Sequence, residues 1–167
     1  MNLQKMPSVM SANLLSLSAR KQVSAILEKV RESTPLEEID IIQLSQRDLD
    51  LLYSMAYTFY DAGQYQKAKM LFLKLLFSAP FVAAYWKGAG AVSFMLKEQE
   101  DALIYYGVAA LITPKDPLVH FYAAKVLIDL NRKDEALGAI AQAEALAPAD
   151  DIDFKAQLEV LYEQTSD

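Results

Sequence analysis

The middle of the chain repeats one pattern of proline, small and large apolar residues three times, at a spacing of 34 residues. Proline recurs at Pro80, Pro114 and Pro148. Two columns of small residues and one column of large apolar residues keep the same spacing. Their members are Ala56, Gly90 and Ala124, then Ala68, Ala102 and Ala136, and finally Phe72, Tyr106 and Ile140. Four columns that agree without an insertion predict three copies of one structural unit.

Each copy has the pattern of two helices joined by a short polar turn, such as Asp61-Ala62-Gly63-Gln64. Small residues are expected where two antiparallel helices approach closely, and each proline is expected to end the second helix. A single helix pair cannot bury its apolar face, so the copies must stack. We therefore predict an all-α tetratricopeptide-repeat solenoid with three 34-residue helix-turn-helix repeats, an N-terminal helical arm and a C-terminal capping helix.

The repeats divide the chain into four parts. We expect a flexible N-terminal arm at 1–17, N-terminal helices at 18–48, three repeats at 49–82, 83–116 and 117–150 (together 49–150), and a capping helix with its tail at 151–167. The six repeat helices are predicted at 46–62, 65–78, 82–96, 99–112, 116–130 and 133–147. Ser45 and Asp48 are expected to cap the first of them, and Thr34 and Pro35 to open a short helix that continues to Leu44.

The helix predicted from Ser18 to Arg31 carries its apolar residues on one face. These residues follow the spacing i, i+3, i+4 and i+7, and they are Val23, Ile26, Leu27 and Val30. This face is the only apolar surface of an arm that otherwise carries charged residues, so it is expected to need a partner surface.

Composition excludes several classes of function. The 167 residues carry a net charge of −6, which argues against nucleic acid or an anionic membrane as the main partner. The absence of cysteine excludes disulfides, zinc-thiolate sites and thiol catalysis, and it fits a reducing cytoplasm. Although 53% of the residues are hydrophobic, no run approaches the roughly 18 apolar residues that a membrane helix needs.

Three features raise the question of catalysis or metal binding, and each has a simpler structural explanation. Gly88-Ala89-Gly90 lies at a small-residue column inside a predicted helix, without the further residues of a nucleotide-binding loop. The acidic residues of 150–153 are typical of the first turn of a helix. His120 is the only histidine and takes a position expected for a core aromatic residue. We therefore predict no enzyme, no metal site and no cofactor.

The first helix of each repeat is expected to line a concave groove, with positions 2, 5, 9 and 12 of the unit facing inward. The candidate peptide-binding residues read from these positions are Tyr53, Tyr57, Tyr60, Ala84, Lys87, Ala91, Phe94, Leu118, Phe121 and Lys125. The tyrosines form a stripe along one helix face. A separate stripe, made of Leu52, Met55, Ala56 and Phe59, is expected to supply the core and to leave the tyrosines for the groove.

Tyrosine rings beside small residues make pockets, so an extended peptide with apolar side chains is the predicted ligand. Tyrosine also offers a large contact area at low entropic cost, together with a hydroxyl group for the peptide backbone. Lys87 and Lys125 are candidates for holding backbone carbonyl groups or an acidic residue, although each could equally be a solvated lysine.

The first repeat resembles one family in particular, the class II chaperones of type III secretion, which are tetratricopeptide chaperones of translocator proteins of the low-calcium-response H type. The similarity is carried by the tyrosine-rich stretch at 49–60 and the Gly-Gln-Tyr turn at 63–68. An acidic chain with a helical arm, three repeats and a closing helix also matches this family. The resemblance implies a bacterial cytoplasmic chaperone that keeps hydrophobic pore-forming translocators soluble and separate before export.

The resemblance also implies roles for individual residues. The groove would grip a segment near the N-terminus of the translocator, with a motif of the Pro-x-Val/Leu-x-x-Pro type. Tyr53, Tyr57 and Tyr60 would form pocket walls that Phe94 and Phe121 complete. The apolar face of the N-terminal helix (Val23, Ile26, Leu27 and Val30) would be the contact of a homodimer.

The sequence argues against one other binding function and leaves a second open. A co-chaperone domain of the eukaryotic type clamps an acidic C-terminal peptide with Lys and Asn at positions 5 and 9 of the first unit, where this chain has Tyr53 and Tyr57. The third unit of this chain has Leu118 and Tyr122 where such a clamp needs basic residues, so the clamp is not assembled. A scaffold or adaptor subunit of a larger protein assembly, bound through its convex face, is the main alternative.

Overall fold

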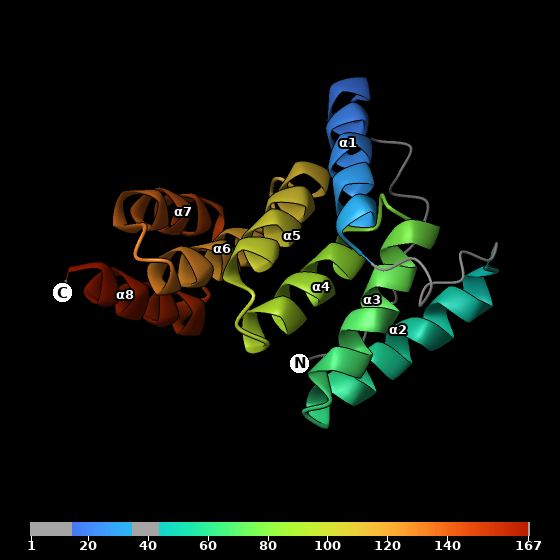
Figure 1. The fold of residues 1–167 in the computed structure, drawn as a ribbon. Helices are drawn as coiled ribbons and strands as arrows, with labels where there is room; N and C mark the ends of the chain where they lie inside the picture. Colours follow the sequence, from blue (N-terminus) through green and yellow to red (C-terminus); the bar gives the residue numbers. More distant parts are fainter. Residues whose placement is uncertain (1–14, 35–43, 167) are drawn as a thin grey trace.

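The computed structural model describes residues 15–34 and 44–166. Within these ranges the chain is entirely helical, apart from its turns, and forms a stack of helix pairs (Figure 1). The helices are α1 (Leu17–Ser33), α2 (Gln46–Asp61), α3 (Tyr65–Ser78), α4 (Ala83–Met95), α5 (Gln99–Ile112), α6 (Pro117–Asp129), α7 (Lys133–Leu146) and α8 (Ile152–Ser166). The predicted all-α repeat fold is confirmed. Most of the predicted flexible arm and the short helix predicted to start at Pro35 lie outside the described residues.

The three repeats are the pairs α2 and α3, α4 and α5, and α6 and α7, each packed against the next. Their helices begin and end within one residue of the predicted positions. Ser45 caps α2 as expected: its hydroxyl accepts a hydrogen bond from the Asp48 amide at 3.3 Å, and its own amide donates to the Asp48 carboxylate at 3.0 Å. Hydrogen bonding to Ser45 lowers the pKa of Asp48.

The turn inside each repeat contains one residue in the left-handed backbone region. Gly63 has φ of 71°, Lys97 has 64° and Asn131 has 56°, again at the spacing of the repeat. In each turn the following amide bonds back to the first helix, and these bonds have lengths of 2.8 to 2.9 Å. Glycine and asparagine adopt this conformation readily, whereas Lys97 must be held there by the packing of the two helices.

The small-residue columns mark the closest approaches between helices. All six of their residues are buried. At Gly88, two residues before the column residue Gly90, an added Cβ atom would stand only 2.1 Å from the buried ring of Phe72 on α3. At Gly90 an added Cβ atom would lie 3.0 Å from the ring of Tyr106 on α5. The Gly88-Ala89-Gly90 segment therefore serves helix packing, as predicted.

Charged side chains connect successive repeats. Lys69 of the first repeat pairs with Glu98 of the second. Lys87 of the second pairs with Asp116 at 2.8 Å, and Asp116 also caps the start of α6 through the amide of Leu118. Such partly exposed pairs contribute little stability individually. They fix the position of one helix pair on the next.

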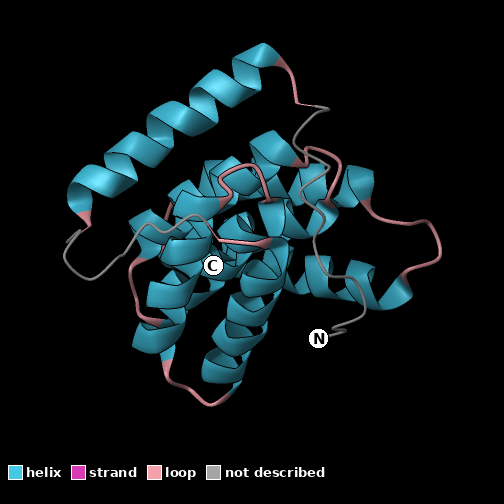
Figure 2. Ribbon diagram, turned by 90° about the vertical axis from the view of Figure 1, so that its right-hand side faces the viewer, coloured by secondary structure: helices cyan, strands magenta, loops and turns pink. Residues whose placement is uncertain are grey.

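The N-terminal helix α1 lies at the edge of the molecule and packs against the repeats, chiefly on α5 (Figures 1 and 2). Val23 is 0% and Val30 is 7% exposed, and both belong to the same core as the first two repeats. Ile26 and Leu27 are half-buried against this core. The chain itself therefore supplies much of the partner surface that this face was expected to need.

At the other end, α8 covers the third repeat. Phe154, Leu158 and Leu161 are buried against Phe121, Ile140 and their neighbours. The amide of Phe154 donates a 2.9 Å hydrogen bond to the carboxylate of Asp151, which caps the helix. No helix in the described part of the chain is both long enough and apolar enough to cross a membrane.

The contact between Gly88 and Phe72 yields a stability prediction. We expect Gly88→Ala to lower the free energy of unfolding by about 2 kcal/mol, because the new methyl group must displace a fully buried ring. Gly138→Ala is the matched control, since Gly138 is exposed inside α7 and nothing lies within 4 Å of its added Cβ. The control should gain up to about 1 kcal/mol in urea unfolding. Equal stability of the two variants would contradict the prediction.

Candidate peptide-binding groove

A small cavity opens between the first helices of the three repeats. Its volume is about 100 Å³, and its lining comes from α2, α4, α5 and α6. The lining residues are Tyr60, Ala91, Phe94, Met95, Tyr106, Tyr122 and Lys125. Four of the predicted groove residues, Tyr60, Ala91, Phe94 and Lys125, therefore meet around one site.

The remaining wall of the cavity comes from residues that the inward positions do not include. Tyr106 lies on the second helix of its repeat, and its ring stacks on that of Tyr122 with centroids 5.6 Å apart. The Tyr106 ring lies in contact distance of Gly90, where the other two repeats have alanine. The glycine in the small-residue column could have indicated the position of Tyr106, because it leaves room for a large ring from the paired helix.

Tyr53 and Tyr57 have a double role. Their rings pack edge to face with centroids 4.8 Å apart, and the Tyr53 hydroxyl donates to that of Tyr57 at 3.3 Å. Both rings also contact the buried ring of Phe72, and Tyr53 contacts Tyr85. Both tyrosines are only half-buried, so they join the core to the surface instead of standing free in a groove.

The core residues and the groove residues of α2 therefore do not form two separate stripes. Ala56 is buried, but Met55 of the expected core stripe is 40% exposed, and Leu52 and Phe59 are half-buried. The tyrosines supply part of the core packing that these residues were expected to provide. The physical reason is that α2 is the first repeat helix, and in the described part of the chain no helix pair precedes it to cover its outer side.

The other predicted groove residues have different surroundings. Ala84 is half-buried beside the core, and Leu118 is 42% exposed. Phe121 is only 6% exposed and packs on Phe154 of α8, so the capping helix covers a ring that was expected to face the groove. Lys87 is engaged by Asp116 within the chain.

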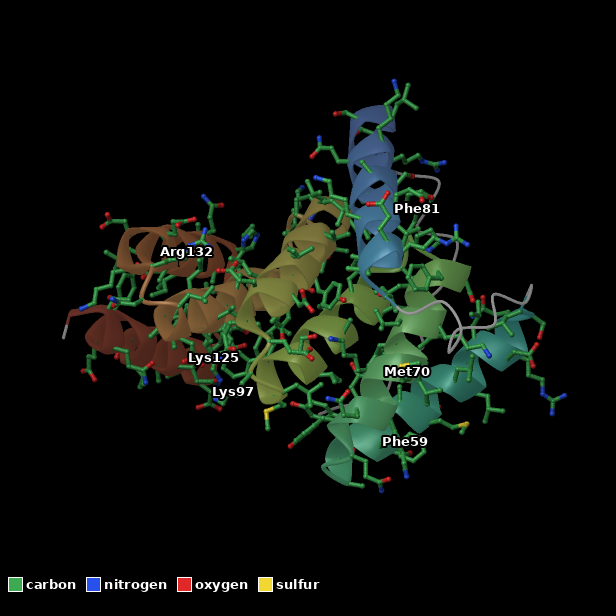
Figure 3. The ribbon with its side chains drawn as sticks, in the orientation of Figure 1. Phe59, Met70, Phe81, Lys97, Lys125 and Arg132 are labelled. Carbon is green, nitrogen blue, oxygen red and sulfur yellow. The ribbon has the colours of Figure 1, made fainter. Side chains whose placement is uncertain are left out.

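Lys125 rests on two aromatic rings. Its Nζ atom lies 5.9 Å from the ring centroid of Phe94 and 5.7 Å from that of Phe121, within the range of cation–π attraction. Lys97 reaches the Phe94 ring as well, at 5.6 Å, and Figure 3 shows the two lysines close together. Of these two ammonium groups, that of Lys97 is paired with Asp129 at 4.0 Å, whereas that of Lys125 lines the cavity.

The residues considered for chemistry take structural positions. His120 is half-buried, and its Nε2 atom lies 3.4 Å from the carbonyl oxygen of Pro114, so it is not the core residue that was expected. Asp151 is used as a helix cap. Within residues 15–34 and 44–166, no three His, Cys, Asp or Glu side chains come close enough to hold a metal ion.

A second, larger cleft lies where α1 meets α5. Its volume is about 520 Å³, and its lining is mainly apolar, with Ile26 and Val30 on one side and Ile104, Tyr105 and Leu111 on the other. Ile104 is 46% exposed. The packing of α1 on the repeats therefore leaves an apolar surface open.

Comparisons with known proteins agree with this architecture. The sequence model of the tetratricopeptide repeat matches residues 49–77 and 83–116. Low calcium response locus protein H of Yersinia pestis is 28% identical over 113 residues, which cover 68% of this chain and 67% of that protein.

Two solved chaperone structures have the same fold. The Yersinia enterocolitica type III secretion chaperone SycD, in complex with a peptide of the translocator YopD, is 25% identical with a TM-score of 0.68, over 75% of this chain and 95% of SycD. SycD has also been crystallised in an alternative dimer. PcrH of Pseudomonas aeruginosa, in complex with the chaperone binding region of PopB, is 30% identical with a TM-score of 0.65, over 72% of this chain and 97% of PcrH.

The chain belongs to the class II chaperones of type III secretion. The identity to PcrH over nearly its whole length, together with the shared fold, establishes this membership. The resemblance seen in the tyrosine-rich first repeat is therefore confirmed at the level of the family.

Three tyrosines with raised pKa values should make the free energy of unfolding depend on pH in the alkaline range. Burial raises the pKa of Tyr85 to about 12, and burial likewise raises the pKa of Tyr57 and Tyr106 above the usual value of 10.0. Above pH 10 the unfolded chain loses these protons before the folded chain does, so stability must fall between about pH 10 and 12.

We expect the free energy of unfolding in urea to decrease by up to about 1.4 kcal/mol per pH unit for each such tyrosine in this range. Tyr85→Phe should show a shallower decrease, because it removes one of the titrating groups. Among the residues that the structure describes, the Tyr85 hydroxyl has no hydrogen-bond partner, so the variant should remain folded at pH 8. Identical slopes for the two proteins would contradict the assignment of Tyr85.

Proposed function

We propose that this chain is a chaperone of the bacterial cytoplasm that binds an extended apolar segment of type III secretion translocator proteins. It keeps these pore-forming proteins soluble and separate before export. The observation that carries the proposal is the meeting of Tyr60, Ala91, Phe94 and Lys125 around one cavity in a chain of this chaperone family. The peptide complexes of SycD and PcrH support it.

The size of the cavity favours a peptide side chain as the ligand. Its volume of about 100 Å³ is well below the roughly 300–1,000 Å³ of sites for small molecules. One aliphatic side chain of an extended segment would fill it, and a motif of the Pro-x-Val/Leu-x-x-Pro type would supply such a side chain between rigid prolines. The aromatic walls offer apolar contact at a low entropic cost.

The mode of action that we propose is binding without catalysis. The polar groups nearest the cavity are tyrosine hydroxyls and Lys125, and the sole histidine contacts the carbonyl oxygen of Pro114. A tyrosine hydroxyl is neutral at pH 7 even at its ordinary pKa, and burial raises the pKa of Tyr60 and of Tyr106 further. Neutral tyrosines can donate hydrogen bonds to the backbone of a peptide but are poor general bases at neutral pH.

We also propose that two copies of the chain associate over the cleft between α1 and α5. SycD forms dimers, and this cleft exposes apolar side chains next to the helix that was expected to make the contact. Of the four residues first considered for the dimer, Ile26 and Val30 line the cleft. Val23 is fully buried within the chain, and Leu27 is half-buried against its core.

Filling the cavity should weaken peptide binding. We expect Ala91→Phe to weaken binding of a labelled Pro-x-Leu-x-x-Pro peptide at least about tenfold, because the new ring occupies the space of the peptide side chain. Ala141→Phe, at an exposed position of α7, is the control and should bind normally. Both variants should show the circular dichroism of the parent protein. Unchanged peptide affinity in Ala91→Phe would refute the cavity as the binding site.

The proposed dimer can be tested at Ile104. We expect Ile104→Asp to shift the protein from dimer to monomer at micromolar concentration in analytical ultracentrifugation, because it places a charge on the apolar cleft. Ile104 is 46% exposed, so the substitution should leave the fold intact. Ile152→Asp, at a more exposed apolar residue of α8, should remain dimeric. A dimer that persists in Ile104→Asp places the interface elsewhere.

A further inference from the structure

Lys125 is a half-buried cation without a counter-charge in the described part of the chain. In residues 15–34 and 44–166, no carboxylate oxygen lies within 4.0 Å of its Nζ atom. Lys69 and Lys87, which are also partly buried, each have a carboxylate partner. Asp129, one helical turn after Lys125, is engaged instead by Lys97 at 4.0 Å and by Gln99 at 3.2 Å.

The surroundings of Lys125 favour a charged partner from outside the chain. Its ammonium group lies over Phe94 and Phe121, and it lines the same cavity as Tyr60 and Tyr122. Aromatic walls lower the local dielectric constant, so an ion pair formed there is stronger than one in water. Cation–π contact compensates only part of the hydration that a half-buried lysine loses.

A carboxylate suits this position better than a backbone carbonyl group. A hydrogen bond from an ammonium group to a carboxylate is charge-assisted and roughly twice as strong as a neutral one. The remainder of the chain carries more acidic than basic residues, so an acidic peptide is repelled by most of the surface. The end of the cavity where the Lys125 ammonium group lies over the Phe94 ring is the exception.

We propose that Lys125 makes the cavity selective for peptide segments that carry Asp or Glu next to the apolar side chain that fills it. This inference rests on the peptide-binding function proposed above and specifies the chemistry of its ligand. The apolar side chain occupies the space beside Ala91, and the neighbouring carboxylate pairs with the Lys125 ammonium group. The two lysines that flank Phe94 thereby set the register of an otherwise apolar segment.

The test uses synthetic peptides of the form Pro-x-Leu-x-x-Pro with acetylated and amidated ends, so that no terminal charge contributes. Three acidic peptides carry Glu at one of the x positions and Ala at the others, and three matched peptides carry Gln instead. We expect the best acidic peptide to bind the full-length protein about tenfold more tightly than its Gln counterpart in fluorescence anisotropy at low salt. This preference should shrink as the salt concentration rises.

Two variants separate the role of Lys125 from that of net charge. In Lys125→Gln the acidic and Gln peptides should bind equally, with the affinity that the parent protein has for the Gln peptide. Lys133→Gln changes the net charge equally but lies at the start of α7, outside the cavity lining, and should keep the tenfold preference.

The possible failures of this test are distinguishable. If the Gln peptides bind but no acidic peptide binds more tightly, or if Lys125→Gln keeps the preference, the selectivity of Lys125 is refuted and the chaperone groove stands. If Lys125→Gln weakens both kinds of peptide equally, Lys125 holds a backbone carbonyl group and the carboxylate is refuted. If no peptide binds the parent protein, the proposed groove fails together with the selectivity.

Discussion

The close approach of α4 to its neighbouring helices at Gly88 and Gly90 determines where the large aromatic side chains of this protein lie. Gly88 allows the ring of Phe72 to occupy the interface between the first two repeats, and Gly90 lets the ring of Tyr106 approach α4. Tyr106 then stacks on Tyr122 of the third repeat and closes one side of the cavity. The packing of the solenoid and the shape of its candidate binding site therefore depend on the same two glycines.

The cavity combines an apolar wall with one positively charged group, the ammonium group of Lys125. Tyrosine rings surround it, and Lys125 places an ammonium group over two phenylalanine rings at its edge. Such an arrangement suits binding through side-chain complementarity. It fits a chaperone that holds a client segment and releases it unchanged, which is the function proposed for this member of the family.

The two ends of the helix stack are covered to different extents. At the C-terminal end α8 buries Phe154 against Phe121 and covers the third repeat. At the N-terminal end α1 packs across the repeats. Within the described residues no helix pair covers the outer side of α2, where Met55 is exposed and Tyr53 takes part in the core. The cleft beside Ile104 follows from the same placement of α1.

The sequence by itself determined the fold and the family. The columns of small residues at the 34-residue spacing indicate close helix contacts, because such contacts depend on local residue size. The helix bounds, the caps and the packing role of Gly88 could therefore be predicted. The tertiary structure decided which groove positions remain open, because burial depends on elements far apart in the chain. Phe121 is covered by α8 and Lys87 is engaged by Asp116, while Tyr106 reaches the cavity from the other helix of its repeat. The placement of α1 was likewise decided by tertiary packing, since an apolar helix face indicates that a partner surface exists but not which surface it is.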